Sequence, residues 1–159
     1  WLEKGSVFSI TVPMHSGQLN SSPPPIQQDS SPAKPLAGLQ VLCVDNESSI
    51  LVGMHSLLSR WGCDVLTASK RHECASLIQS GIVPDLALVD YHLDAGDTGI
   101  ELLSWLRQQL EAPIPGIVIS ADGRPELVSE VHTAGLDFLA KPVKPAALRA
   151  LINRYRPLS

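Results

Sequence analysis

The chain has 159 residues and a mass of 17.1 kDa, enough for one ordinary domain and an additional segment. Its apolar fraction of 44% and charged fraction of 18% are typical of a globular protein, and no apolar run approaches the ~20 residues of a membrane helix. The formal charge is -4 and the basic residues are spread along the chain. We therefore expect neither nucleic-acid binding nor direct membrane contact.

The beginning of the chain differs in composition from the rest. Within residues 1–15, apolar and polar side chains alternate as in a strand until a proline stops the pattern. Residues 16–37 are rich in serine, glutamine and proline, and they predict a linker because they bury too little apolar area to offset their ordering entropy. We expect the folded domain to span residues 38–159.

Strand and helix patterns alternate from residue 39 onward. Helical spacing after the first strand predicts a helix over residues 50–61, with Asn46 or Ser48 as its N-cap and Gly62 at its end. Strands are predicted near residues 41–44, 65–67, 85–89, 117–120 and 137–140, and the remaining helices near residues 71–79, 103–110, 124–134 and 145–152.

The predicted strands are mostly apolar, which indicates that both of their faces are buried. Parallel strands with helical crossovers satisfy this pattern, because right-handed connections place helices on both faces of the sheet. The sequence therefore predicts an α/β domain with a doubly wound, five-stranded parallel sheet. The most suitable strand order is 2-1-3-4-5, as in flavodoxin-like folds.

Several of these strands end on polar side chains suited to phosphate chemistry. Asp45, Asp90 and Ser120 follow the first, third and fourth strands, and Lys141 follows the last. Because the carboxyl ends of parallel strands share one edge of the sheet, we expect these groups to meet in one pocket. Two carboxylates, a hydroxyl and an ammonium can hold a divalent cation and a phosphoryl group.

Four motifs carry a family resemblance: Val-Leu-Cys-Val-Asp45-Asn46, Leu-Val-Asp90, Val-Ile-Ser120 and Phe138-Leu-Ala-Lys141-Pro142. In this order and spacing they resemble the receiver domain of two-component response regulators, over residues 39–156. The resemblance implies a phosphoacceptor domain that takes a phosphoryl group from a phosphohistidine, carried by a histidine kinase or a phosphotransfer domain.

The resemblance also implies the parts of the phosphoacceptor site. Asp90 would be the nucleophile that becomes an acyl phosphate. Mg²⁺ would be bound by Asp45, Asn46, Asp90 and the backbone carbonyl of His92. Lys141 would pair first with the Asp90 carboxylate and later with the phosphoryl group.

Further residues take positioning and switching roles by the same resemblance. Ser120 would donate its hydroxyl to a phosphoryl oxygen, and Pro142 would position the preceding lysine through a cis bond. Ser120 and Phe138 would be the switch pair, although Phe138 is equally consistent with a plain core aromatic. His92 and Asp122 would tune the lifetime of the phosphoryl group.

One departure from the family pattern leaves a second interpretation open. Asn46 stands where most receivers carry a second acid, so the pocket lacks one negative charge and weaker magnesium binding is expected. The alternative is a degenerate receiver that acts as a non-phosphorylated docking or inhibitory domain. The presence of Asp90, Ser120 and Lys141 favours phosphorylation.

The residues before the domain suggest a parent protein. Residues 5–13 resemble the closing strand of the ATP-binding domain of histidine kinases. With the linker that follows, this implies the C-terminal receiver of a hybrid sensor histidine kinase in the cytoplasm. The chain itself would catalyse only its own phosphorylation and dephosphorylation.

Other enzyme classes fit less well. Asp97-Thr98-Gly99 copies the aspartic-protease motif, but it precedes a leucine-rich helix rather than lying between strands of an all-β fold. Aspartyl-nucleophile phosphatases need a second acid where His92 stands. A glycine-rich phosphate loop is missing after the first strand, which disfavours a nucleotide-binding relative.

Overall fold

The computed structural model describes residues 36–156. The predicted strand within residues 1–15 and most of the predicted linker lie outside these residues. Of the linker only residues 36–37 are described, and Leu36 is 1% exposed and packs against the core. Its backbone N–H donates to the Trp61 carbonyl at 3.1 Å, so the packed part of the chain includes at least this residue.

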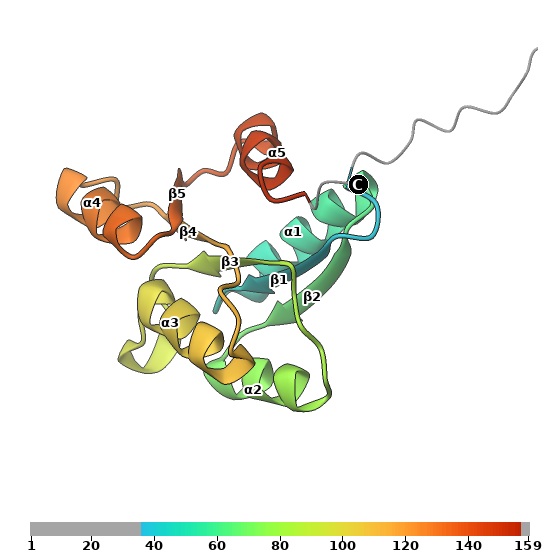
Figure 1. Ribbon diagram of the computed structural model, residues 1–159. Helices are drawn as coiled ribbons and strands as arrows, with labels where there is room; N and C mark the ends of the chain where they lie inside the picture. The colour runs from blue at the N-terminus through green and yellow to red at the C-terminus, as the bar shows by residue number, and fades with distance from the viewer. Residues whose placement is uncertain (1–35, 157–159) are drawn as a thin grey trace, which may run out of the picture. The chain divides into compact units, whose positions relative to one another are not determined.

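Strands and helices alternate through the described residues, as predicted (Figure 1). The strands are β1 (Gln40–Val44), β2 (Asp64–Ala68), β3 (Leu86–Asp90), β4 (Gly116–Ser120) and β5 (Asp137–Ala140). The helices are α1 (Ser48–Trp61), α2 (Arg71–Gln79), α3 (Gly99–Leu110), α4 (Pro125–Thr133) and α5 (Pro145–Asn153), and a short 3₁₀ turn, η1 (Asp94–Gly96), was not predicted.

Local sequence explains most of the helix ends. Thr98 and Glu101 form a capping box that starts α3, and Pro145 opens α5. Gly62 ends α1 with a φ of 96°, as expected for a glycine in the left-handed region. The predicted N-cap of α1 is wrong: the N-cap residue is Glu47, and no side chain caps the helix.

The five strands form one parallel sheet in the order β2-β1-β3-β4-β5, which confirms the flavodoxin-like prediction. Helices α1 and α5 pack on one face, and α2, α3 and α4 pack on the other. In the view of Figure 1, α1 and α5 lie above the strands, and α2 and α3 lie below them. Among the described helices, none has the length and apolar character needed to cross a membrane.

The register of the sheet aligns the ends of its central strands. Asp90 is opposite Ile119 in the pairing of β3 with β4, and Ser120 is opposite Ala140 in the pairing of β4 with β5. The backbone N–H of Lys141 then donates to the Ser120 carbonyl at 2.8 Å. The polar residues at the strand ends therefore leave the sheet along one edge.

The three cysteines lie in the packed core, and their burial changes the pKa values of their thiols. Cys43, Cys63 and Cys74 are free and buried. Burial raises the pKa of Cys43 from 9.0 to about 12, and burial raises the pKa of Cys74 to about 11. Burial likewise raises the pKa of Cys63 above its ordinary value.

We expect the free energy of unfolding to fall as the pH rises above 9. In the folded chain Cys43 and Cys74 keep their protons there while the unfolded chain releases them, which costs about 1.4 kcal/mol per pH unit for each of these two thiols. Below pH 9 both states are protonated and the effect is absent. Urea unfolding at pH 8 and pH 10 measures the loss. A Cys43→Val variant should lose less than the parent chain, and an equal loss in both would contradict the assignment.

Candidate phosphoacceptor site

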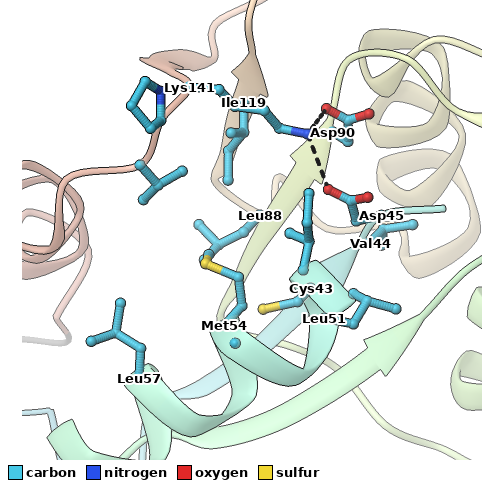
Figure 2. A pocket seen from close by; sticks show the side chains of 14 residues that line it. Cys43, Val44, Asp45, Leu51, Met54, Leu57, Leu88, Asp90, Ile119 and Lys141 are labelled. Carbon is cyan, nitrogen blue, oxygen red and sulfur yellow. Dashed lines mark hydrogen bonds and ion pairs between the residues drawn. The ribbon is translucent and has the colours of Figure 1, made fainter. Parts of the chain in front are cut away.

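A lysine lies between two nearly buried carboxylates at the edge of the sheet. Lys141 Nζ is 2.9 Å from Asp90 Oδ1 and 3.3 Å from Asp45 Oδ2 (Figure 2). Asp45 is 5% exposed and Asp90 is 6% exposed. Carboxylates at this depth are costly unless paired, so the ammonium is the group that makes their charge tolerable.

The surroundings of Lys141 act on its pKa in opposite directions. Burial disfavours the charged ammonium, while the hydrogen bond and charge of Asp90 and the charge of Asp45 favour it. The attractive interactions prevail, and the pKa of Lys141 is raised above its ordinary value. The lysine is therefore a permanent cation of the site at neutral pH.

Asp45 is also held by the start of the next helix. Its Oδ1 accepts a hydrogen bond from the backbone N–H of Glu47 at 2.8 Å, while Oδ2 accepts from Lys141. The Asp45 backbone N–H donates to the carbonyl of Ala68, the last residue of β2, at 3.3 Å. These contacts hold both carboxylate oxygens of Asp45 and its backbone N–H in place.

Asn46 has a partner that the sequence did not predict. Its Nδ2 donates to Asp94 Oδ1 at 2.9 Å, across 48 residues of chain. Asp94 begins η1 in the loop between β3 and α3. The side chain that replaces the expected second acid therefore contacts an acid from another loop.

Ser120 and Asp122 form a local turn at the end of β4. Ser120 is fully buried, and its Oγ accepts a hydrogen bond from the Asp122 backbone N–H at 3.0 Å. The Asp122 carboxylate pairs with the Arg124 guanidinium through contacts of 2.7–3.0 Å. These hydrogen bonds from Arg124 lower the pKa of Asp122, which stays ionised.

The other residues predicted for the site, His92, Phe138 and Pro142, differ in how far they are buried. His92 is exposed directly after β3, and its ring packs edge-on against Tyr91 with centroids 4.8 Å apart. Phe138 is half-buried and packs into the cluster under α4, on the face of the sheet opposite α1. The bond between Lys141 and Pro142 is cis.

An apolar cavity of about 320 Å³ adjoins the two carboxylates. Figure 2 shows Met54, Leu51 and Leu57 of α1 beneath Asp45 and Asp90, with Lys141 reaching across from the far side. Other apolar lining residues come from the sheet and from the segment after β5. The charged site is therefore polar at the sheet edge and apolar toward α1.

A comparison with protein families identifies the family to which this chain belongs. The family model for the response regulator receiver domain matches residues 41–153. The chain belongs to the receiver domain family. This confirms the resemblance seen in its strand-end motifs.

Individual relatives agree with this assignment. The chain is 30% identical over 122 residues to "Two-component response regulator ORR6" of Oryza sativa subsp. japonica, covering 74% of this chain and 71% of the relative. It is 32% identical over 115 residues to "Alkaline phosphatase synthesis transcriptional regulatory protein PhoP" of Bacillus subtilis (strain 168), covering 72% of this chain. It spans only 47% of the length of that protein.

Solved structures of receivers share the fold. Chemotaxis response regulator CheY4 of Vibrio cholerae superposes with a TM-score of 0.65 at 25% identity. The match covers 76% of this chain and all of that structure.

The donor atoms of this receiver suit a magnesium ion. Mg²⁺ takes oxygen ligands, and the carboxylates of Asp45 and Asp90 both lie within 3.3 Å of the Lys141 ammonium, so their oxygens are close enough to share a small cation. No set of three or more His, Cys, Asp and Glu side chains is gathered for metal binding within residues 36–156.

Sequence reasoning missed two residues next to this receiver site. Asp94 contacts Asn46, and Gly99 lies so close to the Asp90 carbonyl that an added Cβ would be 2.5 Å from its oxygen. The sequence contains a weak signal for Gly99, because glycine is unfavourable in a helix and α3 begins on it. For Asp94 there is none, because its partner is fixed by the folded loops.

Proposed function

We propose that this receiver domain accepts a phosphoryl group from a phosphohistidine onto Asp90. The observation that carries the proposal is the Lys141 ammonium within 2.9 Å of Asp90 and 3.3 Å of Asp45. Receiver domains generally interact with histidine kinases or phosphotransfer proteins and use Mg²⁺ for phosphorylation. The phosphodonor class and the ion for this chain follow from those general properties.

In the proposed reaction, a carboxylate oxygen of Asp90 forms a bond to phosphorus and the bond between phosphorus and the imidazole nitrogen breaks. The donor ring, protonated at its other nitrogen, leaves as neutral imidazole. A bound Mg²⁺ would lower the repulsion between the carboxylate and the phosphoryl oxygens. Lys141 adds a second positive charge beside the attacking oxygen.

Ser120 is suited to assist at the phosphoryl group. Its oxygen already accepts a hydrogen bond from the backbone of Asp122, so its hydroxyl proton is available for donation. We assign the switch role to Ser120 with Phe138 and the tuning of phosphoryl lifetime to His92 and Asp122. Pro142 positions Lys141 in this proposal.

The surface beside the site supports a protein phosphodonor. The apolar cavity next to the carboxylates is lined by Ile50, Leu51 and Leu57 of α1, which are only half-buried. Partly exposed apolar side chains that line a cavity beside a reactive group are typical of a contact surface. A histidine-bearing helical partner could bury them while presenting its ring to Asp90.

We assign the parent protein to the hybrid histidine kinases of the cytoplasm. The strand pattern of residues 5–13 and the linker composition of residues 16–37 support this. Reading the coding region before Trp1 tests it. An ATP-binding domain and a histidine-bearing helix should be encoded there, and an unrelated domain would contradict the assignment.

The central experiment is intact-mass measurement of the full chain after incubation with Mg²⁺ and acetyl phosphate. We expect one phosphoryl adduct that hydroxylamine removes, as it does other acyl phosphates. The adduct should be absent in Asp90→Ala and when the metal is chelated. Asp97→Asn, which changes a carboxylate outside the site, should retain it.

Two outcomes would contradict the proposal. An adduct that persists in Asp90→Ala would place the acceptor elsewhere. A folded parent chain that forms no adduct with either acetyl phosphate or a phosphorylated phosphotransfer domain would favour the docking or inhibitory role instead.

A further inference from the structure

The hydrogen bond between Asn46 and Asp94 bears on how this receiver binds its cation. Asn46 follows β1 directly, and Asp94 lies four residues beyond Asp90. The donor is Asn46 Nδ2 and the acceptor is Asp94 Oδ1, at 2.9 Å. Because the carboxamide is planar, committing its nitrogen to Asp94 leaves its oxygen as the atom available for a cation.

The loop that carries Asp94 is held by contacts other than this hydrogen bond. His92 and Thr98 form an antiparallel bridge across it. The Leu93 N–H donates to the Asp97 carbonyl at 3.3 Å, and Arg71 pairs with the Asp97 side chain at 3.0 Å. Asp94 is thus presented to Asn46 by a loop with its own internal contacts.

The charge balance of the site completes the argument. With an acid at position 46, a receiver of this pattern has three carboxylates against one lysine. Here Asp45 and Asp90 are the two carboxylates beside Lys141, and the carboxylate in contact with Asn46 is Asp94. Counting Asp94, the group has the same net charge although position 46 is neutral.

We infer that Asp94 compensates for the missing acid by supplying its charge from outside the ligand set and by orienting and polarising the Asn46 amide. This inference rests on the proposed function. A carboxylate that accepts from the far side of a ligand increases the basicity of the ligand atom, and removing such partners typically costs about 10–100-fold in metal affinity. Asp94 is therefore a positioning residue for the magnesium site.

The test is titration of the full chain with MgCl₂, followed by nuclear magnetic resonance shifts of the backbone amides at constant ionic strength. Asp94→Asn should raise the dissociation constant by about tenfold, the lower end of that range because both side chains are exposed. Asp64→Asn is the control, since it removes one exposed carboxylate on β2 that holds no part of the Asp94 loop, and its dissociation constant should change less than twofold.

A charge-exchange variant separates this role from damage to the loop. Asn46→Asp alone should bind Mg²⁺ more tightly than the parent chain. Combining Asn46→Asp with Asp94→Asn should return the affinity to near the parent value, because the acid has moved from one position to the other. A double variant that binds as weakly as Asp94→Asn would overturn the inference.

The outcomes also distinguish this inference from the proposed function. If the parent chain binds Mg²⁺ and forms the Asp90 adduct but Asp94→Asn binds like Asp64→Asn, only the inference fails. If the parent chain neither binds Mg²⁺ nor forms the adduct, both the function and the inference are overturned.

Discussion

Replacing Lys141 with methionine should lower the free energy of unfolding by about 2–3 kcal/mol at pH 7 in the absence of Mg²⁺. Methionine keeps most of the length of the side chain and removes its charge. Asp45 and Asp90, 5% and 6% exposed, are then left without their common cation. We expect less than the loss typical of fully buried pairs, because the Lys141 side chain is 22% exposed.

The response to Mg²⁺ identifies the cause of this loss. Adding Mg²⁺ should stabilise the Lys141→Met variant more than the parent chain, because the ion takes over the role of the missing cation. Urea unfolding of both chains with and without Mg²⁺ measures the effect.

Lys144→Met is the matched control for this experiment. Lys144 is exposed, lies three residues further along, and is the N-cap residue of α5 without a side-chain cap. Its replacement should change stability by less than about 0.5 kcal/mol. Equal stability of Lys141→Met and the parent would show that the two carboxylates do not depend on the lysine.

The fold was predictable because its local and global signals agree. Apolar strands such as Leu86–Asp90 alternate with helices bounded by Gly62 or Pro145, and right-handed crossovers in that order place helices on both faces of a parallel sheet. The errors were local. The N-cap of α1 was assigned to a polar side chain, whereas Asp45 accepts from the Glu47 N–H and no side chain caps the helix.

The candidate site was predictable only where it depends on strand ends. The sequence predicted that the side chains of Asp45, Asp90 and Lys141 lie close together, because parallel strands end at a common edge of the sheet. The contact of Asn46 with Asp94 depends on two loop conformations and has no signature in the sequence. The hydrogen bond that the Ser120 oxygen accepts from the backbone N–H of Asp122 has no signature in the sequence either.

Gly99 is the second position at which a single change should have a large effect. Its N–H donates to the Tyr91 carbonyl at 2.9 Å, so the first turn of α3 is fastened to the chain just after Asp90. An added Cβ would lie 2.5 Å from the Asp90 carbonyl oxygen and 3.3 Å from the Tyr91 Cα. These are backbone atoms of a central strand and its exit, so they cannot turn aside as a side chain would.

We therefore expect Gly99→Ala to lower the free energy of unfolding by about 1–3 kcal/mol, as overpacking does in a close-packed interior. The larger effect should be on phosphorylation. Relief of the clash must displace either α3 or the backbone that carries the Asp90 carboxylate, and a displacement near 1 Å costs on the order of a hundredfold in rate. The rate of adduct formation with acetyl phosphate, followed by intact mass, measures it.

Gly53→Ala is the comparison variant, and it should raise the free energy of unfolding rather than lower it. Gly53 lies inside α1 at the edge of the same cavity, and a Cβ there meets no atom within 4 Å. Alanine should stabilise the helix by about 0.5–1 kcal/mol and leave the rate of adduct formation unchanged. If Gly99→Ala behaved like Gly53→Ala, the contact between α3 and Asp90 would not constrain the site. If only Gly99→Ala loses both stability and rate, the glycine of the Asp-Thr-Gly motif is explained by its closeness to the phosphoacceptor.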